Sequence, residues 1–399
     1  MRILFISTWF PYPIDNGSKI RVYHLLRALG ARHDVSLLSF AFDTAQPMNG
    51  TALTSFCTKV ETISCNPFQR QSARTALRFF SLAPIVTLPL PEVTAAAARL
   101  YQQVGFDVVI ASIEVTAAYA LQAPSSTIKV LEEHNSLTRW MRERYEQQTS
   151  LVQRLRCRVS WQKTRAYEAK LFPRFDLCTM VSRMDQQESL NLLKGRSTPI
   201  ETVPNGVDCE HNQPGLCGMQ PDTLIYNGAI TYRANYDAVQ YFLSEVYPCV
   251  RQQHPRVSLT ITGATSGVDR SRLAVDDSVH FSGYVDDIRP IVSRHTVCIA
   301  PLREGGGTRL KILEAMALGV PVVSTSKGAE GLDVIDGEHL LIADEAQAFA
   351  AAVVRLLTDD ELRRKLTHQA RCRVEERYDW SNIGRQFLSL VQDAVQRKQ

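Results

Sequence analysis

The feature that most constrains the fold is an alternation of short apolar runs with helical stretches, repeated in both halves of the chain. Strand-like runs in the first half include Arg2–Ser7 and Ile200–Pro204, and runs in the second half include Leu224–Tyr226 and Val297–Ala300. Helical stretches separate most of these runs. Strands that alternate with helices form parallel sheets covered by helices on both faces. The sequence therefore predicts an α/β protein with two doubly wound, parallel-sheet domains.

A polar, turn-rich stretch, CEHNQPGLCGMQ, separates the two halves and is interpreted as the linker. We place the N-terminal domain at residues 1–205 and the C-terminal domain at residues 206–378. The last predicted helix, over Trp380–Val395, is long enough to cross back onto the first half. Residues 379–399 are therefore expected to form a helix that returns to the N-terminal domain.

The composition is typical of a globular protein and argues against a dedicated nucleic-acid binder. Of the 399 residues 45% are hydrophobic and 22% are charged, and the formal net charge is only +4. The nine cysteines are scattered without a C-x-x-C pair, which favours buried free thiols in a reducing compartment. The chain begins with a strand-like MRILFIST instead of a signal-peptide pattern, and no long apolar stretch could span a membrane. We therefore expect a cytoplasmic protein.

A glycine-rich loop that leads into a helix, PLREGGGTRLKILEAMALGVPVVS, is the strongest functional signal. Gly305, Gly306 and Gly307 have no Cβ, so the backbone can turn sharply and approach a ligand closely. Thr308 is expected to cap the helix, and Gly319 to end it. A helix start presents free N–H groups and the positive end of the helix dipole, which suits an anion such as a phosphate.

Three charged residues distinguish this helix start from an ordinary one. Arg309 and Lys311 put positive charge in the first turn, where a helix alone favours Asp or Glu. Glu314 lies about 9 Å beyond Thr308 along the helix axis, and its side chain leans back toward the N-terminus. A diphosphate at the helix tip and a ribose diol against Glu314 would fit this spacing. The alternative is a plain helix start whose charges face water.

Polar residues in the first half follow two predicted strands, at the sheet edge where α/β proteins bind ligands. Gly17, Ser18 and Lys19 lie between the first strand and a helix expected from about Ile20. They match neither G-x-G-x-x-G nor the P-loop motif, so they form either an acceptor-side loop or a plain turn. His134 belongs to the EEHN cluster that follows a buried strand, and it is either a functional or a structural histidine.

Two segments mix basic and apolar residues. Residues 70–91 either rest on an anionic membrane surface or cap the edge of the domain. Residues 137–174 are rich in Arg and Lys with interleaved Trp and Tyr. They form either a solvated helix pair or a surface for an acidic or lipid-phosphate acceptor. Peripheral contact with the inner face of the cytoplasmic membrane is one expectation for this chain.

With these motifs the sequence resembles the retaining family-four glycosyltransferases, which have the GT-B fold, over nearly its whole length. The most specific parts are VPNGVD at 203–208, YNGAITYRANYDAV at 226–239 and GGGTRLKILEAMALGVPVVST at 305–325. The resemblance implies two Rossmann-like domains that face a cleft. It also implies transfer of a sugar from a nucleotide diphosphate sugar, with retention, to a glycan or lipid-linked acceptor in exopolysaccharide or cell-envelope synthesis. No cofactor and no nucleic-acid partner are implied.

The resemblance also assigns donor-binding residues. Glu314 matches the second, ribose-binding glutamate of the family's Glu-x7-Glu motif. The first glutamate would fall on Gly306, as in a branch of the family that reads GGGTRLK. Gly228 and Arg233 lie in the motif after the first strand of the second domain. The family usually has an Arg and a Lys at this place, and in this chain Arg233 is the one basic residue near it.

The expected chemistry is charge stabilisation without a metal. Arg309 and Lys311 would neutralise the departing diphosphate, and His134 would polarise a hydroxyl of the acceptor or donor. No Asp-x-Asp pair occurs, so a metal clamp is not expected. The competing hypotheses are a non-catalytic nucleotide-sugar-binding protein, which Gly306 favours, and a GT-B epimerase or phosphorylase. A nicotinamide dehydrogenase is disfavoured because the glycine fingerprint is missing after the first strand.

Overall fold

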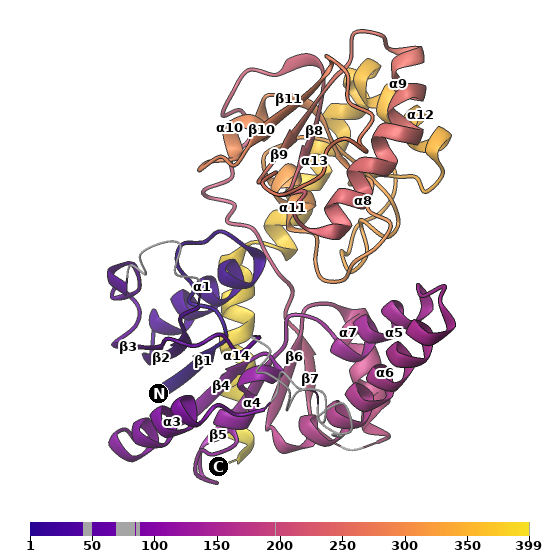
Figure 1. The fold of residues 1–399 in the computed structure, drawn as a ribbon. Coiled ribbons are helices and arrows are strands. Elements are labelled where there is room, and N and C mark those ends of the chain that lie inside the picture. Colours follow the sequence, from indigo (N-terminus) through magenta and orange to yellow (C-terminus); the bar gives the residue numbers. More distant parts are fainter. Residues whose placement is uncertain (43–49, 69–83, 85–87, 196, 399) are drawn as a thin grey trace. The chain divides into compact units, whose positions relative to one another are not determined.

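The computed structural model describes residues 1–42, 50–68, 84, 88–195 and 197–398, and the chain divides into two compact units (Figure 1). The first unit comprises Met1–Pro204 and Ile383–Gln399, and the second comprises Asn205–Asn382. Each unit contains one parallel sheet with its helices. The predicted fold class, two doubly wound α/β domains, is confirmed.

The first unit is built on a seven-stranded sheet in the order β3-β2-β1-β4-β5-β6-β7, in which every pair of neighbours is parallel. The central strands are buried almost throughout, as continuous apolar runs in parallel sheets usually are. The strands are β1 (Arg2–Ser7), β2 (Asp34–Phe40), β3 (Lys59–Ile63), β4 (Val108–Ser112), β5 (Ile128–Glu132), β6 (Leu177–Met180) and β7 (Ile200–Thr202).

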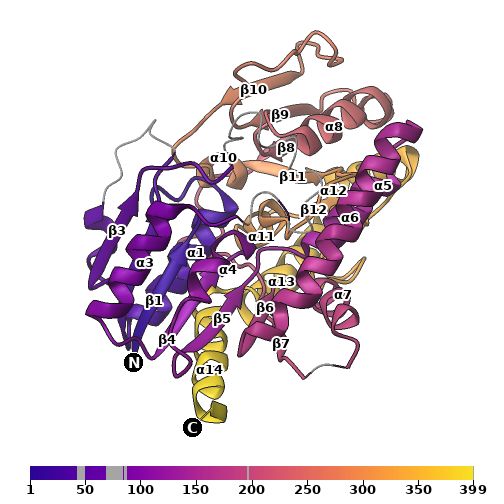
Figure 2. The same cartoon turned by 60° about the horizontal axis from the view of Figure 1, so that its bottom comes forward.

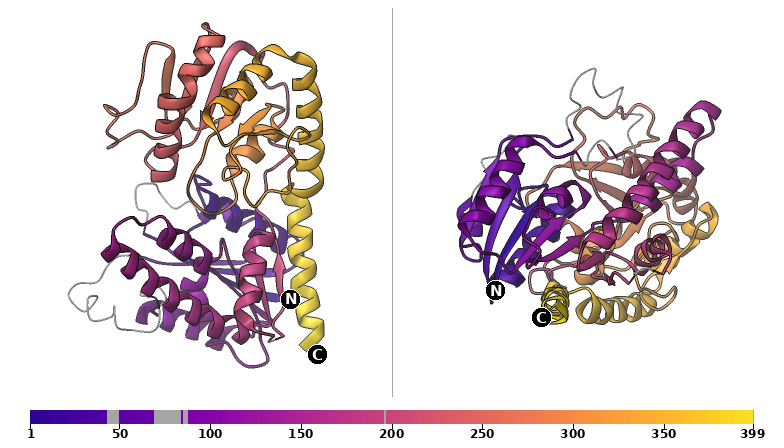
Figure 3. Two further views of the ribbon diagram at one scale, coloured as in Figure 1. Left: turned by 90° about the vertical axis from the view of Figure 1, so that its right-hand side faces the viewer. Right: turned by 90° about the horizontal axis from the view of Figure 1, so that it is seen from below.

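Most of the last helix of the chain, from Ile383 onward, belongs to the first unit (Figure 3). Its side chains Phe387 and Val391 are buried, and the Gln386 amide donates a 2.9 Å hydrogen bond to the Thr202 carbonyl. The helices of this unit are α1 (Gly17–Gly30), α3 (Pro91–Gln103), α4 (Glu114–Ala120), α5 (Leu137–Glu146), α6 (Leu151–Leu171), α7 (Arg183–Leu193) and α14 (Trp380–Lys398), with short 3-10 turns at η1 (Gly50–Leu53) and η4 (Phe172–Arg174).

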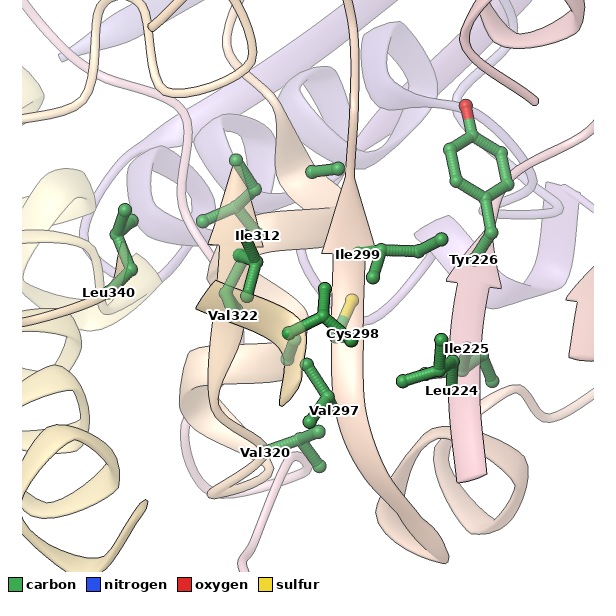
Figure 4. Packing of buried hydrophobic residues seen from close by; sticks show 14 of the residues in the cluster. Leu224, Ile225, Tyr226, Val297, Cys298, Ile299, Ile312, Val320, Val322 and Leu340 are labelled. Atoms are coloured by element: carbon green, nitrogen blue, oxygen red, sulfur yellow. The ribbon is translucent and has the colours of Figure 1, made fainter. Parts of the chain in front are cut away.

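The second unit is built on a six-stranded parallel sheet in the order β10-β9-β8-β11-β12-β13. Figure 4 shows its core, where Leu224 and Ile225 of β8 lie beside Val297 and Ile299 of β11. The sequence did not predict the short last strand. The strands are β8 (Gln220–Asn227), β9 (Ser258–Thr262), β10 (Val279–Gly283), β11 (His295–Ala300), β12 (Val322–Ser324) and β13 (Leu341–Ile342).

Helices connect the strands of the second unit and close its core. Among them, the π-helical turn η5 (Phe242–Val246) joins two α-helices, and Phe242 packs edge-on against Phe349 with ring centroids 6.0 Å apart. The α-helices are α8 (Arg233–Tyr241), α9 (Tyr247–Gln253), α10 (Arg289–Ser293), α11 (Leu310–Ala317), α12 (Ala346–Thr358) and α13 (Asp360–Arg377).

The two basic segments of the sequence have different outcomes. Most of the segment 70–91, including its arginines, lies outside the described residues, so its two interpretations stay predictions. The segment 137–174 forms the hairpin of α5 and α6, followed by η4 (Figure 2).

Candidate active site

In the second unit, β8 and β11 meet where the strand order changes direction. Chain connections run from β8 outward to β9 and β10 on one side, and from β11 outward to β12 and β13 on the other. Parallel sheets bind ligands beyond the carboxyl ends of the strands at such a switch point. Here β8 ends at Asn227 and is followed by Gly228, and β11 ends at Ala300, shortly before the glycine loop.

The glycine loop adopts a conformation that favours glycine and is held by a buried arginine. Gly305 and Gly307 have φ of 98° and 80°, in the left-handed region. The Arg309 guanidinium donates 2.6 Å hydrogen bonds to the carbonyls of Gly305 and Gly306, and the Arg309 residue is only 8% exposed. In this structure Arg309 therefore binds the loop backbone.

The predicted cap of α11 is wrong. The helix begins at Leu310, and Arg309 occupies the cap position without a side-chain cap bond. The Thr308 carbonyl accepts from the Leu310 amide at 3.1 Å, whereas the Thr308 hydroxyl is buried with no hydrogen-bond partner in the described parts of the chain. The arginine anchors the loop from within, so a hydroxyl cap is not required.

Lys311 points across the switch point to β8 and α8. Its ammonium lies 4.0 Å from the centre of the Tyr226 ring, and it donates hydrogen bonds to the Tyr226 hydroxyl at 2.8 Å and to Asn235 Oδ1 at 3.0 Å. A Cβ at Gly228 would lie 2.6 Å from this ammonium, so a side chain there would displace it. Gly228 is thus required for the position of Lys311.

The pKa of Lys311 is lowered to about 7, chiefly by burial; Cys298 and Glu314 act to raise it, and the nearby Arg309 also acts to lower it. Its hydrogen bonds go to a hydroxyl and an amide oxygen, neither of which is an anion. The free protein therefore holds a lysine whose charge would be stabilised by an incoming anion.

Glu314 lies one turn further along α11. Its Oε2 accepts a 3.1 Å hydrogen bond from the Asn227 amide at the end of β8. Burial raises the pKa of Glu314, while Lys311 and the Asn227 hydrogen bond act in the opposite direction. The structure thus brings Gly228, Lys311 and Glu314 together at the end of β8.

Arg233 lies at the start of α8, and its side chain is 88% exposed. Its guanidinium is 3.4 Å from the Glu304 carboxylate, which precedes the glycine loop. Because Arg233 is exposed, this pair contributes little to stability. Glu304 is the acidic residue of this loop, since Gly306 stands where the resemblance expected one.

In the first unit, helix α1 starts earlier than predicted. It begins at Gly17 and not near Ile20, because Asn16 caps it by accepting a 3.1 Å hydrogen bond from the Lys19 amide. Gly17, Ser18 and Lys19 therefore form the first helical turn. Lys19 is paired with Asp15 at 2.9 Å.

His134 lies beyond β5, with both ring nitrogens in polar contacts. Its Nδ1 is 3.2 Å from the Ser18 hydroxyl, and its Nε2 is 3.1 Å from both the Ser112 hydroxyl and the Glu132 carboxylate. The Trp9 ring stacks on the imidazole with centroids 5.9 Å apart. The structure thus brings His134 and Ser18 together at the switch point between β1 and β4.

The charge of Glu132 fixes the role of each histidine nitrogen. Although burial raises its pKa, the Arg21 guanidinium and then His134 hold the pKa of Glu132 at about 2. An ionised carboxylate only accepts hydrogen bonds, so Nε2–H of His134 donates to Glu132. In the neutral imidazole, Nδ1 then accepts from the Ser18 hydroxyl.

Sequence reasoning missed several residues that complete these two sites. Tyr226, Asn227 and Asn235 all fall within the quoted motif YNGAITYRANYDAV, and their position after a predicted strand was the available signal. Ser112 ends β4 beside the switch point, which only the strand order reveals. Within the described residues, no group of His, Cys, Asp and Glu side chains could hold a metal ion. In the same residues, no helix has both the length and the apolar character of a membrane span.

Two family models match the chain. Residues 15–211 match the model described as Glycosyltransferase Family 4, and residues 221–359 match the model described as Glycosyl transferases group 1. The chain belongs to the family-4 glycosyltransferases. The glycine-loop site lies in the second matched range, and His134 and Ser18 lie in the first.

Similar proteins support this assignment and show the GT-B architecture. The glycosyltransferase is 22% identical to an uncharacterized 44.6 kDa protein of the cps region of Klebsiella pneumoniae, covering 96% of this chain and 97% of that protein. It is 29% identical to a phosphatidyl-myo-inositol mannosyltransferase of Mycolicibacterium smegmatis, covering 57% and 59% of the two chains. The Anabaena protein HepE in complex with UDP superposes with a TM-score of 0.71 at 17% identity, covering 98% and 100% of the chains.

Proposed function

We propose that this glycosyltransferase moves a sugar from a nucleotide diphosphate sugar to a glycan or lipid-linked acceptor, with retention of the anomeric configuration. We further propose a role in exopolysaccharide or cell-envelope glycan synthesis, at the inner face of the cytoplasmic membrane. The relative in a cps region, the mannosyltransferase relative and the UDP complex of HepE support this direction. The observation that carries the proposal is Lys311, a lysine of lowered pKa at the switch point, with no anionic hydrogen-bond partner among the residues that the structure describes.

In the proposed complex the donor diphosphate lies against Lys311. The Thr308 hydroxyl and the first N–H groups of α11 would donate to its oxygens. The ribose diol would bind Glu314, which accepts a single hydrogen bond from Asn227 and can accept others. Arg309 would act as a positioning residue that keeps the glycine loop open to the diphosphate.

Retention would follow from attack on the face that the diphosphate leaves. The bond from the anomeric carbon to the β-phosphate oxygen breaks, the bond to the acceptor oxygen forms, and the departing phosphate takes the acceptor proton. Negative charge then grows on the phosphate, so the Lys311 ammonium would bind the transition state more tightly than the donor. His134 Nδ1 would orient a sugar hydroxyl in place of Ser18. No metal ion is required in this scheme.

A second candidate function is nucleotide-sugar binding without transfer, and Gly306 is the residue that favours it; epimerisation of the nucleotide sugar is a separate alternative. The test begins with a thermal-shift screen of nucleotide sugars, since a ligand raises stability by mass action. The selected donor is then incubated with purified protein, a glycan and lipid extract and excess chelator. NMR of the product should show a new glycosidic bond with the donor's anomeric configuration. Binding without a product would favour the second candidate, and inversion or dependence on a metal would contradict the scheme.

A further inference from the structure

The tip of the α5–α6 hairpin carries an exposed apolar surface. Leu151, Val152 and Leu155 are 81%, 71% and 63% exposed. Each residue of an α-helix advances by about 100° around the axis. These three side chains and Val159 therefore fall within an arc of about 100° and form one stripe. Large exposed apolar side chains gathered in one stripe mark an interaction surface.

Basic residues border this stripe on both sides. By the same helical geometry, Arg154 and Arg158 lie along one edge, and Arg156 and Lys163 lie along the other. Between Gln147 and Tyr167 the chain contains five basic residues and no acidic residue. Arg154, Arg156 and Arg158 form no ion pair with any residue of the described parts of the chain. These three arginines at the edges of the stripe therefore carry positive charge that no ion pair within the described residues compensates.

The acidic side chains of the hairpin belong to α5 or are buried in α6. Glu143 and Glu146 belong to α5, where they pair with Arg139 at 3.5 Å and Arg142 at 3.9 Å. Glu168 lies toward the other end of α6 and is buried. The exposed start of α6 therefore carries basic residues without an acidic residue of its own.

Aromatic contacts fix the tip as a rigid unit. The Tyr145 ring of α5 stacks on Trp161 of α6 with centroids 5.7 Å apart, and the Arg154 guanidinium lies 5.1 Å from the Tyr145 ring. Figure 2 shows the two helices side by side. These contacts hold the two helices together, so the helices need not be ordered relative to each other on binding.

From this arrangement we propose that the tip of the α5–α6 hairpin is a docking site for an anionic phospholipid membrane. Leu151, Val152 and Leu155 insert at the level of the headgroups and acyl chains, and the flanking arginines contact lipid phosphates. A second copy of the chain suits the surface less well. A two-fold contact would set each basic edge against another basic edge, with no acid between residues 147 and 167 to compensate.

The test is co-sedimentation of the full chain with vesicles of phosphatidylcholine alone or mixed with phosphatidylglycerol. Wild-type protein should bind the mixed vesicles, and salt should weaken the binding. Replacing Arg154, Arg156 and Arg158 with Gln should reduce the partition coefficient on the order of a hundredfold. Replacing Leu151, Val152 and Leu155 with Ser should reduce it at least about tenfold.

Matched control variants carry the same types of change elsewhere on the surface. Arg256 and Arg272 to Gln, and Leu216 and Val275 to Ser, alter exposed residues of the second unit and should bind vesicles like wild type. All variants should keep the wild-type melting temperature, because the altered side chains are exposed.

A fluorescence measurement separates insertion from adsorption. Leu155→Trp should show a blue-shifted emission with mixed vesicles, relative to wild type under the same conditions. Equal binding by wild type and both hairpin variants would overturn the proposal. Loss of self-association in the Ser variant with unchanged vesicle binding would also overturn it, and would assign the stripe to a second copy.

Discussion

The ammonium of Lys311 lies over the ring of Tyr226, 4.0 Å from the ring centre, and donates a 2.8 Å hydrogen bond to the Tyr226 hydroxyl. This pairing joins α11 to the end of β8. The ring attracts a cation, but burial has the larger effect and lowers the pKa of the lysine to about 7. The buried Lys311 ammonium is thus energetically unfavourable in the free protein, and a bound diphosphate would stabilise it.

Lys311→Met should weaken binding of the donor and stabilise the free protein. Loss of one charged hydrogen bond would reduce the binding free energy by about 2 kcal/mol, or roughly thirtyfold in Kd. The Tyr226 hydroxyl still donates its 2.8 Å hydrogen bond to Asn235, so the substitution leaves neither residue without a hydrogen-bond partner. Calorimetry with the nucleoside diphosphate and a melting curve at neutral pH check both effects. Lys365→Met, on the exposed face of α13, is the matched control. A lower melting temperature in Lys311→Met than in this control would contradict the account.

Donor binding should also depend on pH through Lys311. The folded-state pKa of about 7 lies below the usual value for lysine, so above pH 7 the free protein has lost this proton. A bound diphosphate would raise the pKa and take the proton up again, so affinity should fall by up to roughly tenfold per pH unit above 7. Titrations in two buffers of different ionisation enthalpy measure the proton uptake. It should vanish in Lys311→Met, and an affinity that stays constant as the pH rises would rule the lysine out.

Glu314→Gln should weaken donor binding by about 1–3 kcal/mol, because the ribose diol would lose a charged acceptor. The Asn227 amide can still donate to the remaining oxygen, so the fold should be preserved. Comparing a nucleoside diphosphate with its 2′-deoxy analogue isolates the diol contact. The wild type should prefer the ribose form, and the variant should lose most of that preference. A variant that discriminates as strongly as wild type would remove Glu314 from this role.

A buried carboxyl of the first unit should make stability depend on pH. Burial raises the pKa of Glu168 to about 8, although the Thr138 hydroxyl acts against the shift. The contribution of a raised carboxyl is complete below its unfolded pKa of about 4.3 and is lost as the pH rises through its folded pKa. Glu168→Gln should therefore lose less stability than wild type between about pH 5 and 8. Melting temperatures across this range measure the effect, with the exposed Glu146→Gln as control. Parallel curves for wild type and Glu168→Gln would contradict the pKa shift.

The sequence predicted the elements of the fold better than the contacts of the site. The spacing of apolar residues along a strand or helix indicates which of its faces is buried. For this reason the two sheets and the helix α14 could be anticipated. The direction of the Arg309 side chain could not, because it depends on loop carbonyls brought together by Gly305 and Gly307. Likewise, the partners of His134 come from β4, β5 and α1, and only the strand order makes them neighbours.

The most direct test of the account is the initial rate of nucleoside diphosphate release from the donor selected by the thermal-shift screen. Wild-type protein, Lys311→Met and Lys365→Met are compared with acceptor extract and excess chelator. We predict release by wild type and by the control, and a kcat lower by about a hundredfold or more in Lys311→Met, as for loss of one preorganised donor at a developing negative charge. No release by the wild type, or the same kcat in Lys311→Met as in wild type, would contradict the proposed transfer at this site.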